Sequence, residues 1–175
     1  MNNENRTPDY DFSKLTEPFK ALISSPEQMF QFLDMFPMPM EVFTPDGTTA
    51  FLNRAMIDMF GMVNPDAETG VGKFNILNDP VSDEVFGHEV IERAFRGEAV
   101  SVSEFRAPIQ DLVDRGLTQE KPFEAAYLDV YMLPLWNDDR LAFVTAIFTQ
   151  KRMYQGIPRS GGGERIYRRQ LARRI

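Results

Sequence analysis

The first sustained run of apolar positions has helical spacing and predicts a helix from Ser25 to Phe36. Ser25 can cap the first turn, and Pro26 suits the first helical position because the N–H that proline lacks has no partner there. Pro37 and Pro39 end the pattern, since proline cannot continue a helix. The apolar residues of this helix are Met29, Phe30, Leu33 and Phe36. Such a bulky face needs another surface to cover it.

Strand spacing follows directly after these prolines. In EVFTPDGTTAFLN, residues 41–53, two short apolar runs flank the turn sequence PDG, in which glycine supplies the positive φ of a turn. This segment is expected to form a β-hairpin. Asn53 can cap the short helix RAMIDMF that follows, and Gly61 stands where a left-handed C-terminal cap belongs.

One long amphipathic helix is expected from Ser82 to about Arg96. Its wet side carries two i,i+4 pairs, Glu89 with Arg93 and Glu92 with Arg96, each with the glutamate on the favourable N-terminal side. The opposite side is apolar and is expected to face the interior. The apolar residues are Val85, Phe86, Val90, Ile91, Ala94 and Phe95.

Three strands are expected after this helix, over residues 99–109, 123–136 and 140–150, with a tight turn joining the last two. Residues 110–121 are interpreted as a polar insertion with room for one helical turn. The second strand is apolar on both faces, so each face needs cover by helices or by another subunit. One face carries Leu128, Val130, Met132 and Pro134, and the other carries Tyr127, Asp129, Tyr131, Leu133 and Leu135.

Length and charge predict one domain between two tails. The 175 residues, 43% of them hydrophobic and 15 of them Phe, suffice for one good core. Residues 1–24 are expected to be a mobile segment, 25–152 the domain, and 153–175 a basic linker or tail. Residues 151–175 hold eight bases and one acid, a charge of +7. Because the whole chain has a net charge of −7, residues 1–150 carry −14. This acidic body is not expected to bind nucleic acid directly or an anionic membrane.

Several function classes are excluded by residue counts. Without cysteine the chain has no disulfide, no thiolate metal site and no cysteine nucleophile. A catalytic triad or a histidine metal cluster would depend on His88 alone, so neither catalytic nor metal-binding residues are expected. No basic-then-apolar start and no run of about 18 apolar residues occurs, so we expect a cytoplasmic protein with no membrane span.

The stretch ETGVGKFNILNDP, residues 68–80, contains a partial match to nucleotide-binding loops. A Walker A loop has Ser or Thr after Gly-Lys, but Phe74 follows Lys73. The dinucleotide pattern also fails, because Asn75 stands where its third glycine belongs. The glycines are expected instead to turn the loop into a helical layer, with Asn75 as the polar side chain there that can touch a ligand.

The order of these elements, and four motifs within them, resemble the PAS domain, a sensory module of signalling proteins. The motifs, within residues 26–152, are PDGTTAFLNRAMIDMFG, GKFNILNDP, AFRGE and YLDVYMLPLWNDDRLAFVTAIF. The resemblance implies an α+β fold: a five-stranded antiparallel sheet with short helices on one face and an N-terminal cap helix on the other. PAS domains occur in sensor kinases and in AraC-like transcription regulators. The chain departs from the family's Asp-Ile-Thr ending, of which only Thr149 remains.

By this resemblance the chain is a regulatory domain that binds a small molecule between sheet and helices, forms a homodimer, and acts on an effector absent from this chain or C-terminal to it. The expected pocket residues are Met56, Phe60, Phe74, Asn75, Leu77, Phe86, Val90, Ile91, Leu128, Val130, Met132 and Val144. The expected dimer or cap-helix contacts are Met29, Phe30, Leu33, Phe36, Tyr131 and Leu133. The signal is expected to leave through Thr149, Gln150, Lys151 and Arg152.

The cofactor stays open at this point. Photochemistry through a cysteine–flavin adduct is excluded, whereas an aromatic pocket accepts a non-covalent flavin. Haem-binding PAS domains commonly take an iron ligand from the long helix, where His88 lies at the edge of the apolar face; the alternative is an ordinary boundary histidine. Two other functions remain: a pure dimerisation module, and a cone-like enzyme of the ketosteroid-isomerase type that would use Asp129, Tyr127 and Tyr131.

Overall fold

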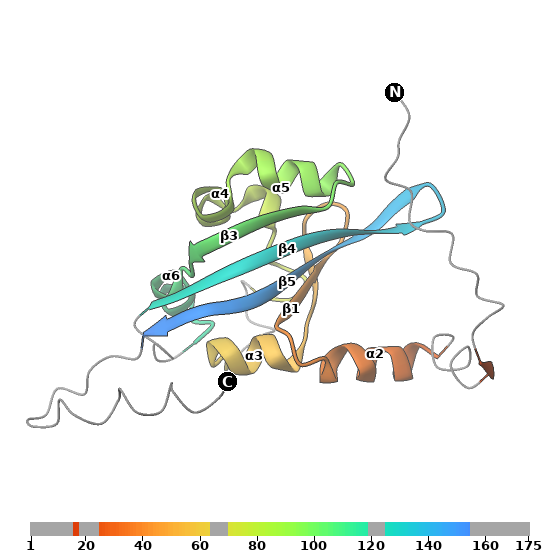
Figure 1. Ribbon diagram of the computed structural model, residues 1–175, viewed down its shortest axis with the longest axis horizontal. Helices are drawn as coiled ribbons and strands as arrows, with labels where there is room; N and C mark the ends of the chain where they lie inside the picture. The colour runs from red at the N-terminus through yellow and green to blue at the C-terminus, as the bar shows by residue number, and fades with distance from the viewer. Residues whose placement is uncertain (1–15, 18–24, 64–69, 119–124, 155–175) are drawn as a thin grey trace, which may run out of the picture.

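The computed structural model describes residues 16–17, 25–63, 70–118 and 125–154. Most of the two predicted tails therefore lies outside the described residues, although the last strand passes the predicted domain boundary at residue 152. At the centre is a five-stranded antiparallel sheet, as the sequence predicted, and its strand order is β2-β1-β5-β4-β3 (Figure 1). The strands are β1 (Met40–Phe43), β2 (Thr49–Leu52), β3 (Val100–Arg106), β4 (Ala125–Asn137) and β5 (Arg140–Tyr154).

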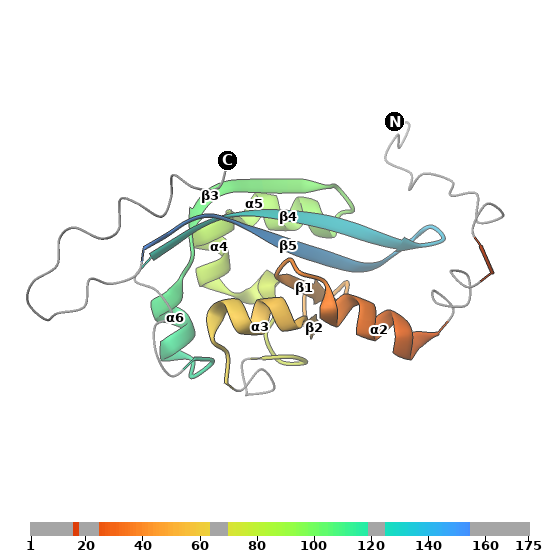
Figure 2. The ribbon, with the colours of Figure 1, turned by 60° about the horizontal axis from the view of Figure 1, so that its bottom comes forward.

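Short helices cover one face of this sheet. The helices are α2 (Pro26–Met35), α3 (Arg54–Phe60), the 3₁₀ turn η2 (Ile76–Asn78), α4 (Pro80–Phe86), α5 (His88–Phe95) and α6 (Ile109–Asp114). Figure 2 shows α3, α4, α5 and α6 together beneath the sheet, whereas α2 extends away from them at one side. The α+β arrangement predicted from the sequence is thus confirmed.

The predicted caps position the first two helices. The Ser25 side chain accepts a hydrogen bond from the N–H of Gln28, with proline at the first helical position. The Asn53 side chain accepts from the N–H of Met56 at 2.9 Å, and Gly61 ends α3 in the left-handed conformation with φ 59°. These local signals were strong enough to give the element boundaries directly.

The single long helix predicted from Ser82 to Arg96 is wrong, because the chain breaks at Gly87. This glycine has φ 86°, a conformation that L side chains rarely adopt, and it separates α4 from α5. Helix α4 also begins earlier than predicted: its cap is Asp79, which accepts from the N–H of Ser82 at 2.8 Å. The break changes the direction of the backbone within the helical layer.

One of the two predicted charge pairs on this segment forms. Arg96 contacts Glu92 at 3.1 Å, as expected for an i,i+4 pair. Arg93 instead makes its close contact with Glu98 at 2.8 Å, beyond the end of the helix, and interacts with Glu89 only through longer-range charge attraction. The pairs are exposed and contribute little to stability.

The core lies between the inner face of the sheet and the helices. Leu128, Val130 and Met132 alternate along β4 toward the helices and are almost completely buried. Ile91 and Ala94 meet them from α5 and are equally buried. The inward face predicted for this strand is therefore the core face.

The outer face of the sheet is not covered by α2, contrary to expectation. Tyr131 and Leu133 remain 43% and 38% exposed on that face. Helix α2 packs at the edge of the sheet, where Phe30 meets Phe51 edge-on with ring centroids 5.3 Å apart. Asn53 fixes this position by donating to the backbone carbonyl of Phe36 at 3.0 Å. Because the helix is held beside β2 and α3, it does not reach the strands in the middle of the sheet.

Candidate ligand cavity

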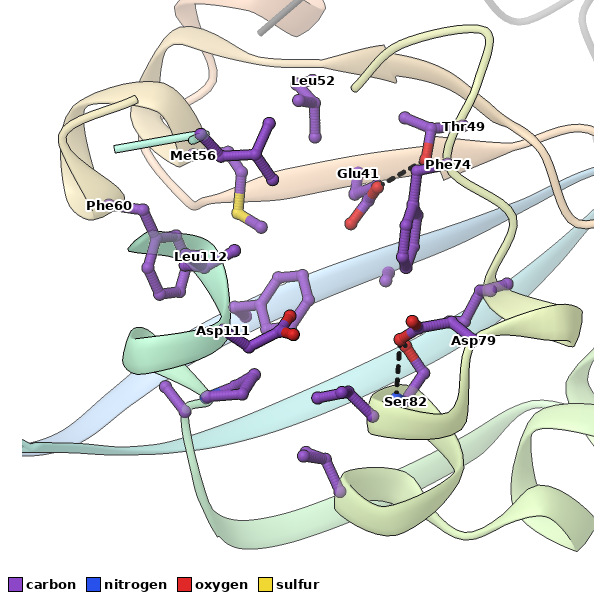
Figure 3. A pocket seen from close by; sticks show the side chains of 18 of the residues that line it. Glu41, Thr49, Leu52, Met56, Phe60, Phe74, Asp79, Ser82, Asp111 and Leu112 are labelled. Atoms are coloured by element: carbon purple, nitrogen blue, oxygen red, sulfur yellow. Dashed lines mark hydrogen bonds between the residues drawn. The ribbon is translucent and has the colours of Figure 1, made fainter. Parts of the chain in front are cut away.

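A largely apolar cavity of about 110 Å³ lies between the inner face of the sheet and the helices. Strands β1, β2, β3, β4 and β5 form one side, and α3, α4, α6 and the loop before η2 form the other (Figure 3). Six phenylalanines contribute to its wall, which makes it suited to an apolar or aromatic group. They are Phe43, Phe60, Phe74, Phe86, Phe105 and Phe148.

Five of the twelve predicted pocket residues line this cavity: Met56, Phe60, Phe74, Phe86 and Met132. Most of the others lie in the adjoining core rather than at the cavity wall. Ile91, Leu128, Val130 and Val144 are buried members of the core, and Leu77 and Val90 pack against it half-buried. The prediction identified the correct layer, but it extended the cavity into space that side chains fill.

Asn75, which was expected to touch a ligand, is not among the residues that line the cavity, and its side chain holds a turn together. Its amide donates to the carbonyl of Asp46 at 2.8 Å, and its oxygen accepts from the N–H of Leu77 at 3.0 Å. Asn75 therefore ties the β1–β2 turn to η2. A Cβ at Gly47 would lie 2.8 Å from Leu77, which explains why this turn approaches so closely at a glycine.

The carboxyl group of Glu41 is the polar feature of the sheet side of the cavity. Glu41 follows the buried Met40 in β1 and points inward, where its Oε1 accepts a hydrogen bond from Thr49 Oγ1 at 2.7 Å. The other carboxyl oxygen faces the cavity (Figure 3). Burial raises the pKa of Glu41 to about 7, and the hydrogen bond from Thr49 offsets only part of this rise. Near neutral pH the group therefore exists in both charge states.

The helical side of the cavity carries a different polar cluster. Asp79 accepts from the N–H and the hydroxyl of Ser82 at 2.8 and 2.7 Å, and from Arg115 at 2.6 Å. Arg115 also contacts Asp111 at 2.7 Å. Burial alone would raise the pKa of Asp79, but the hydrogen bonds from Ser82 and Arg115 outweigh it and hold the pKa below its usual value. Asp79 is therefore ionised near neutral pH, and its hydrogen-bond partners come from within the cluster.

His88 does not line the cavity, and its role as a haem ligand stays a prediction that this placement does not support. The break at Gly87 places His88 at the start of α5 with its side chain 58% exposed. Its Nδ1 is 3.0 Å from Asp83 and its Nε2 is 3.4 Å from Glu92. The alternative interpretation, an ordinary surface histidine, agrees with this placement.

Asp129, Tyr127 and Tyr131 also lie away from the cavity, on the outer face of β4. Asp129 is buried there, and two partners compensate for the burial of its carboxylate: it accepts a hydrogen bond from the N–H of Glu104 at 2.8 Å and contacts Lys151 at 3.0 Å. Glu104 has φ 57° at a bulge of β3, which directs its N–H toward the carboxylate. These residues therefore cannot form the interior acid–base site of an isomerase-type enzyme.

The predicted exit segment is tied to β4 and β3. Thr149 and Gln150 pair with β4 in the sheet, opposite Asp129 and Leu128. Lys151 contacts Asp129, while Arg152 contacts Glu104 and lies over the ring of Tyr127 at 5.4 Å. The end of β5 is thus linked through side chains to β4 and to the bulge of β3.

The part of the chain that the structure describes contains no cluster of three His, Asp or Glu side chains arranged to hold a metal ion. None of the helices within those ranges has the length and apolar character needed to cross a membrane.

Comparison with models of known protein families finds no match, and neither does comparison with curated proteins. Solved structures do match. An RNA-binding light-oxygen-voltage receptor matches with a TM-score of 0.54 and 17% identity, over 80% of this chain and 36% of that chain. The PAS domain of Bordetella pertussis BvgS matches with a TM-score of 0.49 and 18% identity, over 72% of this chain and 85% of that chain.

The PAS domain of an HTR-like protein from Haloarcula marismortui has a TM-score of 0.47 and 16% identity, over 77% of this chain and 98% of that chain. At these identities the similarity concerns the fold alone. The chain has the PAS fold, and the fold predicted from its motifs is confirmed.

Proposed function

We propose that this chain is the sensory domain of a cytoplasmic signalling or transcription-regulatory protein, and that it binds a small molecule in the cavity between sheet and helices. The observation that carries the proposal is the cavity, whose apolar wall includes a few polar groups. A concave apolar site with a small number of placed polar groups is the usual form of a small-molecule site. The proposal assigns no catalytic residue.

The size of the cavity restricts the ligand. A cavity of about 150 Å³ in another protein admits benzene, and the space here is about 110 Å³. Sites for drug-sized ligands run from about 300 to 1,000 Å³. A flavin or a haem is therefore too large for the cavity in this conformation, and a molecule of about the size of a single small ring is favoured.

Signal transfer would run along β5. Phe148 and Ala146 line the cavity, and Lys151 and Arg152 lie only a few residues further along the same strand. A ligand that favours one packing of the sheet against the helices would shift the position of this strand end, and with it an effector or dimer equilibrium. The contacts of Lys151 and Arg152 with Asp129 and Glu104 support a rigid connection.

Dimerisation would use the apolar surfaces that remain exposed. Leu135 and Phe143 are 47% and 39% exposed on the outer face, beside the exposed Tyr131 and Leu133. Phe30 and Phe32 of α2 are also exposed. Contiguous apolar surface of this kind is typical of protein–protein contacts. A second copy of this chain would cover what α2 leaves open.

The cavity is tested by filling it. Ala146→Leu places a larger side chain at a buried position of the wall, and Ala50→Leu makes the same change at an exposed position of β2, two strands away in the sheet. Wild type and both variants are screened by ligand-observed NMR against small neutral fragments that include benzene, toluene and benzyl alcohol. We expect at least one fragment to bind wild type and Ala50→Leu and to lose binding in Ala146→Leu.

Circular dichroism checks that both variants are folded. Equal binding of every fragment by wild type and by folded Ala146→Leu would place binding elsewhere and contradict the proposal. A wild-type protein that binds no fragment at all would contradict it too.

A further inference from the structure

The carboxyl group of Glu41 has one oxygen engaged and one oxygen available. Within the described part of the chain, its only hydrogen bond is the one from Thr49, made by Oε1. The second oxygen faces the cavity (Figure 3). Glu41 is half-buried and is one of the residues that line the cavity. A ligand in the cavity would therefore meet this oxygen directly.

The charges around the cavity favour a cation. Its described lining includes three carboxylates, Glu41, Asp79 and Asp111, and one cationic side chain, Arg115. Arg115 already contacts both Asp79 and Asp111, on the helical side of the cavity. An anionic ligand would meet an excess of negative charge, whereas a cationic ligand would offset the charge that Glu41 carries when ionised.

The aromatic residues of the cavity wall also favour a cationic ligand. Ring faces carry negative electrostatic potential and attract cations within about 6 Å of the ring centroid. Phe74 already has the guanidinium of Arg115 at 5.6 Å from its centroid. The same wall offers Phe43, Phe60 and Phe105 to the apolar body of a ligand. Both parts of a small amphiphilic cation thus find complementary surface.

We propose that the cavity takes a small protonated amine with an apolar or single-ring body, and that the carboxylate of Glu41 pairs with the ammonium group. This inference rests on the proposed function, because it assigns a ligand class to the same cavity. The hydroxyl of Thr49 fixes the carboxylate from the other side, so the free oxygen keeps its direction toward the ligand.

Binding of this kind depends on pH. The ion pair needs the ionised form of Glu41, and burial raises the pKa of that carboxyl to about 7. Among the other charged groups of the wall, hydrogen bonds from Ser82 and Arg115 hold the pKa of Asp79 below its usual value despite burial. Hydrogen bonds to Asp79 and Asp111 raise the pKa of Arg115 despite burial, so both Asp79 and Arg115 keep their charges near neutral pH. Asp111 pairs with Arg115. Affinity for an amine is therefore expected to rise about tenfold between pH 6 and pH 8. Affinity for a neutral analogue should not rise.

The test uses three probes with the same ring: benzylamine, benzyl alcohol and benzoate. Titration calorimetry on the full chain at about pH 7.5 should give benzylamine at least tenfold tighter than benzyl alcohol, since a charged hydrogen bond is worth about 1.5–3 kcal/mol. Benzoate should not bind. Glu41→Gln keeps the size and the acceptor for Thr49, and it should reduce benzylamine affinity to that of the alcohol.

Glu84→Gln is the matched control, because Glu84 is an exposed glutamate of α4 outside the cavity wall. It should retain the preference for benzylamine. If Glu41→Gln does not fold, the pH dependence of the wild type still decides: a benzylamine affinity that stays constant or falls between pH 6 and pH 8 overturns the inference.

Three other results overturn the ligand class. They are equal binding of amine and alcohol, an amine preference that survives in Glu41→Gln, and binding of benzoate. In each of these the cavity still accepts a ligand, so the proposed function stands. Failure of all three probes to bind also overturns the ligand class, and the neutral-fragment screen with Ala146→Leu then decides the proposed function separately.

Discussion

The two sides of the cavity each contain a buried carboxylate, but the two groups are in opposite situations. On the helical side, Asp79 receives hydrogen bonds from Ser82 and Arg115, which hold its pKa below the usual value despite burial. On the sheet side, Glu41 has one hydrogen bond from a neutral hydroxyl, and burial raises its pKa to about 7. Burial acts to raise the pKa of both carboxyls, but only Asp79 has the charged partner and the two Ser82 hydrogen bonds that reverse the effect.

This difference separates a structural role from a binding role. Asp79 caps α4 and holds Arg115, so its oxygens are committed to the fold. Glu41 has an uncommitted oxygen at the cavity, where a ligand can supply the partner that the protein does not. Chemistry is therefore expected at the less satisfied carboxylate, as perturbed groups in clefts often mark functional sites.

The largest effect should come from removing the charge of Glu41 at high pH. The unfolded chain releases this proton near 4.5, whereas the folded protein keeps it until about 7. Stability contributed by the protonated group is complete below 4.5 and is lost as pH rises to about 7. This loss amounts to about 3 kcal/mol. Glu41→Gln has no such proton, so relative to wild type it should gain about that much between pH 4 and pH 8.

Urea unfolding of both proteins across this pH range measures the gain. A stability difference between variant and wild type that does not depend on pH would contradict the raised pKa assigned to Glu41. The fragment-free protein should be used, because a bound amine would stabilise the ionised group and hide the effect.

A smaller loss is expected on the helical side when the partner is removed. Arg115→Ala leaves Asp79 and Asp111 without their shared cation and should cost about 2 kcal/mol at pH 7. The value lies below that for fully buried pairs because the Arg115 side chain is 20% exposed. Arg96→Ala removes the exposed ion pair with Glu92 and should have no resolvable effect. Equal effects of the two substitutions in urea unfolding would show that the cluster is not committed to the fold.

The smallest effect is expected on the pKa of His88, an exposed side chain whose charged partners influence the pKa more than burial does. Its hydrogen bond and charge interaction with Asp83, followed by those with Glu92, raise its pKa above 6.5. An NMR titration of the imidazole should give a value above 6.5, and Asp83→Asn should lower it. A value that does not respond to Asp83→Asn would show that the Asp83 contact is not formed in solution.

Local signals in the sequence were sufficient for most of the fold. The caps at Ser25 and Asn53 and the alternation in β4 are short-range features, and each predicted the observed element. The break at Gly87 was missed because helical periodicity continues through it. A cap-and-proline pair at Asp79 and Pro80, together with a glycine seven residues later, was the available signal for a short helix.

The cavity was harder to predict because it depends on contacts between distant segments. Leu112 and Arg115 come from a stretch interpreted as a polar insertion, although Ile109 and Leu112 have helical spacing. Glu41 gave no signal, since its neighbours Met40 and Val42 are as apolar as Phe43 and either face of β1 can be the inner one. Only the pairing of β1 with β5 determines that Glu41 points inward.

The proposed role of Glu41 in ligand binding depends most on the protonation state of its carboxyl group in the folded protein. Its carbon-13 chemical shift, followed through a pH titration of the ligand-free chain and again with benzylamine, reports that state directly. We expect a Glu41 pKa of about 7 in the free protein and a lower pKa with benzylamine bound. A pKa near 4.5 in the free protein, unchanged by benzylamine, would contradict the proposed role.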